Sequence, residues 1–87
     1  MEVIYSLKAL EDINYWKKNG NKTVQEKIST LIEDILKHPF TGIGKPEPLK
    51  HQLSGSWSRR ITLTDRLVYS VNLENNTIEI ETVRGHY

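Results

Sequence analysis

The stretch WSRRITLTDRLVYSVNLENNTIEIETV, residues 57–83, decides the fold class because it predicts three consecutive β-strands. Residues 66–72 have Leu67, Tyr69 and Val71 on one face and Arg66, Val68 and Ser70 on the other. Such alternation is typical of a strand with one buried face. Residues 64–65 and 73–76 predict tight turns, so the three strands should form an antiparallel meander.

Two helices are predicted before this meander. Ser6 is a candidate N-cap, and Leu7, Leu10, Ile13 and Trp16 recur every three residues as an apolar stripe that ends at the sequence KKNG. The second helix is predicted to begin with a capping box of Thr23 and Glu26. Its apolar positions follow helical spacing: Val24, Ile28, Leu31, Ile32, Ile35 and Leu36. Pro39 should stop this helix near His38.

Residues 2–5 and 49–53 complete the pattern as further predicted strands, which gives the order β-α-α-β-β-β-β over a single domain of residues 1–87. Each helix carries one apolar stripe. We therefore expect an α+β fold in which both helices pack on one face of a twisted, mainly antiparallel sheet. The opposite face is left free for another purpose.

The composition excludes several classes of protein. The chain has 87 residues, a net charge of +1 and no cysteine, which rules out disulfides and thiolate metal sites. His38, His51 and His86 lack metal-ligand spacing, so we expect neither a metal nor another cofactor. No apolar run is long enough to cross a bilayer, and the first residues lack the pattern of a secretory signal. We expect a cytoplasmic protein without membrane contact.

The positive charge is concentrated in residues 45–66. This segment has Lys45, Lys50, Arg59, Arg60 and Arg66 against Glu47 and Asp65, a net charge of +3. A local basic patch attracts a phosphate backbone more effectively than the total charge of the chain suggests. The three arginines and two lysines form a candidate phosphate clamp together with His51, because guanidinium groups donate paired hydrogen bonds to phosphate oxygens. A solvated charged face is the alternative interpretation.

Glu47 and the terminal His86 and Tyr87 add groups that can carry chemistry. Two prolines restrict the backbone around Glu47, which makes it a candidate general base rather than merely a solvated carboxylate. An imidazole can donate a proton near neutral pH, and a tyrosine ring can stack on a base. Strict alternation from Ile78 and Ile80 would direct His86 towards the helices, unless Gly85 breaks the register. A frayed chain end is the alternative.

Three segments of the sequence resemble a known family. The segments GKPEPLKHQLSGSWSRRIT, DRLVYSV and RGHY are similar to the YoeB toxins, which are mRNA interferases of bacterial toxin–antitoxin modules with a RelE-like microbial RNase fold. The resemblance covers the entire chain. One difference is Gly85, where the family commonly has an aromatic residue.

The resemblance implies a role for each matching residue. Glu47 would be the general base for the 2′-hydroxyl, Arg66 would stabilise the scissile phosphate, His86 would be the general acid and Tyr87 would help to position the RNA. Lys50, His51 and Arg60 match basic residues that line the same site in the family. We expect Lys45, Arg59 and Arg84 to bind RNA together with them. The implied partners are mRNA in the ribosomal A site, a YefM-type (Phd-like) antitoxin and a second copy of the chain, with operator DNA bound only through the antitoxin complex. Two alternatives stay open: a non-catalytic module that binds RNA or protein, and an accessory corepressor.

Overall fold

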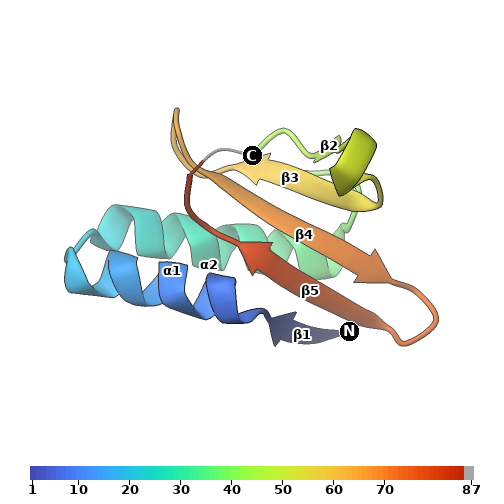
Figure 1. Ribbon diagram of the computed structural model, residues 1–87, viewed down its shortest axis with the longest axis horizontal. Coiled ribbons are helices and arrows are strands. Elements are labelled where there is room, and N and C mark those ends of the chain that lie inside the picture. The colour runs from blue at the N-terminus through green and yellow to red at the C-terminus, as the bar shows by residue number, and fades with distance from the viewer. Residues whose placement is uncertain (86–87) are drawn as a thin grey trace.

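The computed structural model describes residues 1–85, which form helices on one side of a five-stranded sheet (Figure 1). The strands are β1 (Glu2–Tyr5), β2 (Glu47–Pro48), β3 (Ser56–Arg60), β4 (Arg66–Asn72) and β5 (Thr77–Thr82). The helices are α1 (Leu7–Lys18), α2 (Lys22–Lys37) and the 3₁₀ turn η1 (His51–Leu53). The expected α+β arrangement is therefore confirmed.

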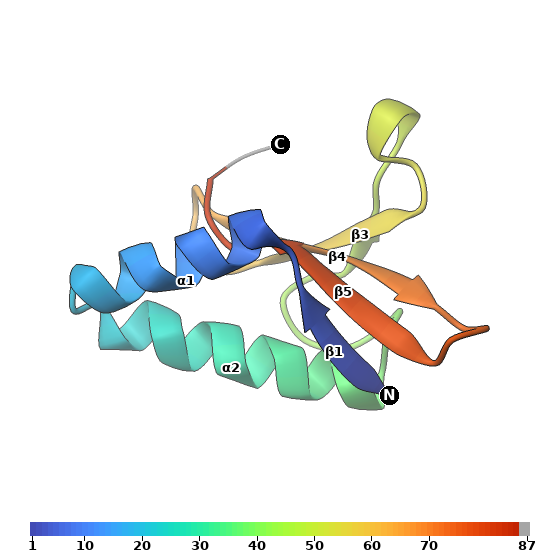
Figure 2. The same cartoon turned by 60° about the horizontal axis from the view of Figure 1, so that its bottom comes forward.

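The sheet has the order β1-β5-β4-β3-β2. The pairs β2–β3, β3–β4 and β4–β5 are antiparallel, as the meander predicted, whereas β1 lies parallel to β5. Figure 2 shows both α-helices on the same side of this sheet, with η1 projecting from the other side. The face of β2, β3 and β4 that points away from the helices is called the open face below.

The second helix follows the sequence prediction along its length but not at its start. Val24, Ile28, Leu31 and Ile35 are buried in the core. The cap is Asn21, whose side-chain oxygen accepts a hydrogen bond from the Val24 backbone N–H, so the predicted capping box at Thr23 is wrong. Asparagine is among the best N-cap residues, and the helix consequently begins one residue before Thr23.

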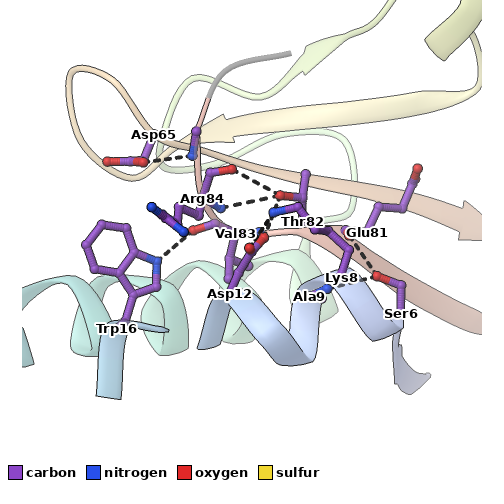
Figure 3. Close-up of polar contacts among 11 residues, drawn as sticks. Ser6, Lys8, Ala9, Asp12, Trp16, Asp65, Glu81, Thr82, Val83 and Arg84 are labelled. Atoms are coloured by element: carbon purple, nitrogen blue, oxygen red, sulfur yellow. Dashed lines mark hydrogen bonds and ion pairs between the residues drawn. The ribbon is translucent and has the colours of Figure 1, made fainter. Parts of the chain in front are cut away.

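The first helix buries only part of the predicted apolar stripe, because Trp16 is buried and Ile13 packs against the core whereas the two leucines do not. Leu7 and Leu10 are 74% and 51% exposed, whereas Ala9, Asp12 and Trp16 are buried. The carboxylate of Asp12 accepts hydrogen bonds from the end of β5, and the indole N–H of Trp16 donates to a carbonyl there (Figure 3). Because buried polar groups need partners, these contacts set the rotation of α1 more strongly than its apolar stripe does.

The predicted strand at residues 49–53 is also wrong. Strand pairing with β3 extends only over Glu47 and Pro48. One residue further, the Leu49 N–H still donates to the Ser56 carbonyl at 2.9 Å. His51 then has a φ of 59°, in the left-handed region, and the chain turns into η1. Pro48 lacks an N–H, which suits a short strand at the sheet edge.

The core lies between the helices and the inner face of the sheet. It contains the buried side chains of α2 together with Leu67, Tyr69, Ile78 and Ile80 of the meander. Leu67 and Tyr69 thus occupy one face of β4 as predicted. Within residues 1–85, no helix is long and apolar enough to cross a membrane.

Candidate RNA-cleavage site on the open face

Glu47 lies on the open face at the edge of the sheet. In the register of the sheet Glu47 lies opposite Ser58, and Ser58 lies opposite Val68. Directly opposed residues project to the same face of a sheet, and Val68 alternates with the core residues Leu67 and Tyr69. The Glu47 side chain is exposed. It is therefore accessible from the side opposite the helices.

Arg60 and Arg66 lie opposite each other on that same face. They are cross-strand partners at the adjoining ends of β3 and β4, two residues along from the Ser58–Val68 pair. Arg60 is exposed and Arg66 is half-buried. Neighbouring strands are about 4.8 Å apart and residues about 3.4 Å apart along a strand, so Glu47 lies about 10 Å across the sheet and about 7 Å along it from Arg66, roughly 12 Å in all. This spacing lets a carboxylate and two guanidinium groups approach one bound phosphodiester from different sides.

Three further basic residues border β2. Lys45 and Lys50 are exposed on either side of it, and His51 is exposed at the start of η1. Together with Arg60 and Arg66 they give the open face a positive charge near Glu47. This charge distribution suits a polyanion.

Arg59 contradicts the sequence prediction that it binds RNA, because it is fully buried on the helix side. Its guanidinium donates to Asp34 Oδ2 at 2.5 Å. It also donates to the carbonyl oxygens of His38, Thr41 and Ile43, at 2.6, 2.9 and 3.1 Å. Arg59 alternates with Ser58 along β3, so it faces the core while Arg60 faces outwards.

The Arg59 network fixes the loop that leads to Glu47. Arg59 Nε donates to the Tyr69 hydroxyl at 3.2 Å, and that hydroxyl donates to the Pro39 carbonyl at 2.6 Å. Further along the loop, the Arg60 N–H donates to the Gly44 carbonyl at 2.7 Å. The segment between α2 and β2 is thereby held at both ends, which positions Glu47 at the sheet edge.

The contacts of this network shift the pKa values of Asp34 and Tyr69. The hydrogen bond from Arg59, followed by that from the Ile43 N–H, lowers the pKa of Asp34 below its ordinary value of 3.8. Burial raises the pKa of Tyr69 above 10.0, although Arg59 acts in the opposite direction. At neutral pH the network therefore contains a carboxylate, a guanidinium and a neutral phenol.

The last described residues continue from the end of β5 alongside the start of β4. Arg84 is exposed, and its guanidinium lies 3.4 Å from the centroid of the Tyr15 ring on α1. The Arg66 N–H donates to the Gly85 carbonyl at 3.1 Å, so the chain passes beside the start of β4. The predicted general acid His86 and the predicted stacking residue Tyr87 lie outside the described residues.

Sequence reasoning missed the polar residues that hold this region together. The Ser56 hydroxyl donates to Glu81 Oε2 at 2.7 Å, and Asp65 Oδ1 accepts the Gly85 N–H at 2.7 Å. One feature of the sequence indicated that Asp65 matters to the site, namely that it directly precedes the candidate residue Arg66. Within residues 1–85, no group of three or more histidine, cysteine, aspartate or glutamate side chains is arranged to hold a metal ion.

Comparison with known proteins agrees with this architecture. Residues 5–87 match the family of YoeB-like toxins of bacterial type II toxin–antitoxin systems. Toxin YoeB of Escherichia coli K12 is 47% identical to this chain, with all of both chains covered. A YoeB/ParE toxin from Agrobacterium tumefaciens has a TM-score of 0.95 and 39% identity, again over all of both chains.

Two solved structures of YoeB from Staphylococcus aureus also match, each over all of this chain and 98% of the matched chain. The YoeB–YefM complex gives a TM-score of 0.88 at 41% identity, and the YoeB dimer gives 0.89 at 40% identity. Fold, sequence and coverage agree throughout. The chain belongs to the family of YoeB-like toxins of bacterial type II toxin–antitoxin systems.

Proposed function

We propose that this toxin is a ribosome-dependent endoribonuclease that cuts mRNA in the ribosomal A site and so inhibits translation. The observation that carries the proposal is the position of Glu47, Arg60 and Arg66 on one open sheet face, clear of the helices. Membership of a toxin family supports it. Since the substrate is mRNA on ribosomes, the toxin acts in the cytoplasm.

The proposed reaction needs three groups. Glu47 removes the proton from the 2′-hydroxyl, whose oxygen bonds to phosphorus while the bond to the 5′-oxygen breaks. Arg66 stabilises the negative charge that develops on the phosphorane. His86 protonates the departing 5′-oxygen, and Tyr87 stacks on a neighbouring base. These roles require no metal ion.

The remaining basic residues bind the RNA backbone. Arg60, Lys45, Lys50 and His51 border the open face, and Arg84 lies on the chain that leads to His86. Contacts of this kind make binding fall steeply with salt and add little sequence preference. Arg59 is excluded from this group by its burial.

Two protein partners complete the proposal. A YefM-type antitoxin neutralises the toxin, and a second copy forms a dimer, as in the S. aureus structures. Contact with operator DNA occurs only through the antitoxin complex.

The test is primer extension on mRNA bound to programmed ribosomes, with the wild type and the variants Glu47→Gln, His86→Gln and Glu74→Gln. The wild type should give one strong stop in the A-site codon. The first two variants should reduce it by about 10²–10⁴-fold, the usual loss when an acid or base is removed. Glu74 is an exposed residue in the β4–β5 turn, so Glu74→Gln should cut like the wild type.

The other outcomes point to the alternatives. A folded wild type that binds ribosomes without cutting would be a binding module. Repression of the operator by the antitoxin complex, without any cut by the free toxin, would favour a corepressor. A stop that Glu47→Gln leaves unchanged would assign the general base to another residue.

A further inference from the structure

Asp65 holds an unusual position between the arginine of the site and the end of the chain. It closes the loop between β3 and β4, and Arg66 follows it directly. Its Oδ2 accepts hydrogen bonds from the hydroxyls of Thr62 and Thr64, at 2.7 and 3.3 Å. Its own backbone N–H donates to the Thr62 hydroxyl at 3.0 Å. The carboxylate is therefore fixed within its loop.

The second carboxylate oxygen reaches the C-terminal chain. Asp65 Oδ1 accepts the Gly85 N–H at 2.7 Å, the dashed line beside Asp65 in Figure 3. The Arg66 N–H donates to the Gly85 carbonyl at 3.1 Å. Both main-chain polar groups of Gly85 are thus bonded to two consecutive residues at the start of β4. Gly85 has a φ of 83°, in the left-handed region, so the chain turns at this point.

The chain before Gly85 is held by a different set of residues. Asp12 Oδ2 accepts the Thr82 hydroxyl at 2.7 Å and the Val83 N–H at 3.1 Å, and the Trp16 indole donates to the Val83 carbonyl at 3.0 Å. These contacts attach the end of β5 to α1. Asp65 therefore controls only the last turn, and its loss should leave the attachment at Val83 in place.

The hydrogen bond from Gly85 is strengthened by the charge of Asp65. Burial alone would raise the pKa of this carboxyl. Hydrogen bonds from Gly85, Thr62 and Thr64, with the charge of Arg84, more than offset that effect and bring the pKa below 3.8. The group is ionised at neutral pH, and hydrogen bonds to an ionised acceptor are about twice as strong as neutral ones.

We propose that Asp65 is a positioning residue of the RNA-cleavage site, which fixes the turn at Gly85 against Arg66 and thereby holds the residue to which the predicted general acid is attached. This inference rests on the proposed nuclease function. The predicted general acid His86 directly follows Gly85 in the sequence. A displacement of about 1 Å in a reacting group can lower a rate by about 10²-fold.

Asp65→Ala and Asp65→Asn separate positioning from simple stabilisation of the loop. Asparagine keeps a carbonyl oxygen that can accept the Gly85 N–H, whereas alanine does not. The control is Asn21→Ala, which removes the cap of α2, far along the chain from the site, at a cost of about 1 kcal/mol. All variants are compared in single-turnover cleavage on programmed ribosomes after their thermal stability has been measured.

We expect Asp65→Ala to lower the maximal cleavage rate by about 10²-fold, while the ribosome concentration that gives the half-maximal rate stays unchanged. Asp65→Asn should recover most of that loss, and Asn21→Ala should cut at the wild-type rate. Amide hydrogen exchange gives a readout without cleavage. In Asp65→Ala, exchange should become faster at Gly85 and stay unchanged at Val83.

Three results would overturn the inference. One is a folded Asp65→Ala variant that cuts at the wild-type rate. Another is an equal loss in Asp65→Ala and Asn21→Ala at equal stability, which would make the role purely structural. The third is unchanged exchange at Gly85. If the wild type does not cut at all, the proposed function fails instead, and the exchange data alone decide whether Asp65 anchors the turn.

Discussion

Arg59 and Arg60 are consecutive in the sequence, and the structure predicts opposite consequences of replacing them. Arg59→Met should lower the free energy of unfolding by about 3–5 kcal/mol, the usual cost of removing one partner from a buried ion pair. Arg60→Met should change it by no more than about 0.5 kcal/mol, because the side chain is exposed. Arg60→Met should instead weaken binding to ribosomes, and more so at low salt.

The magnitude for Arg59 follows from its contacts. Methionine fills a similar volume but offers no donor to the carbonyl oxygens of His38, Thr41 and Ile43, or to Asp34. Asp34 has a side-chain exposure of 20%, so water can replace part of its lost bond, and the lower end of the range applies. A loss of about 3 kcal/mol should lower Tm by about 12 °C or more in a domain of this size.

Thermal unfolding followed by circular dichroism at pH 7 tests this pair, together with Arg59→Lys. Lysine keeps the charge but cannot reproduce the planar fork, so its Tm should lie between those of the wild type and Arg59→Met. A Tm for Arg59→Met within about 2 °C of the wild type, less than a loss of 0.5 kcal/mol produces, would refute the reasoning. So would loss of cleavage at unchanged stability, because it would make Arg59 an RNA contact.

Three further predictions concern the end of the chain and the Arg59 network. Gly85→Ala should increase hydrogen exchange at amide 85, because an alanine in the left-handed region costs about 1–2 kcal/mol. No steric clash contributes, since among the described residues other than its chain neighbours no atom lies within 4 Å of the added carbon. Trp16→Phe should lower Tm by about 4 °C or more in thermal unfolding, because the unpaired Val83 carbonyl costs at least about 1 kcal/mol. Asp34 has a lowered pKa in the folded state, so its stabilising contribution is present above pH 3.8 and is lost as the pH falls through that lowered value. Urea unfolding between pH 5 and pH 2 should therefore be less pH-dependent for Asp34→Asn than for the wild type.

The parts of the fold that sequence alone predicted are those in which one periodic signal dominates. Val24, Ile28, Leu31 and Ile35 repeat over slightly more than three turns of α2, and all four are buried in the core. In α1 the spacing of Leu7 and Leu10 was equally regular and nevertheless misleading. The orientation of α1 depends on hydrogen bonds to residues about 70 positions later in the chain, and no local pattern records them.

The sequence likewise predicted some residues of the candidate site correctly and misassigned another. The sequence located Glu47 between its prolines and Arg66 after its turn, and the sheet brings both to the open face. The sequence could not distinguish Arg59 from Arg60 by residue type. Alternation did contain the answer, because Arg59 shares its face with Trp57 and Ile61, whereas Arg60 does not. A charged residue in an apolar row is better interpreted as buried and paired than as a surface contact.

One irregularity near the end of β5 changes which of the following residues face the core. Strict alternation would put Thr82 and Arg84 on the core face with Ile78 and Ile80. In the structure Tyr69 pairs with Ile80, but Val68 pairs with Thr82, so β5 contains one residue more than β4 at this point. This bulge reverses the alternation: Val83 is buried in the core, and Arg84 is exposed. The break in register thus comes before Gly85 rather than at it. Gly85, with a φ of 83°, is then the turn that Asp65 holds.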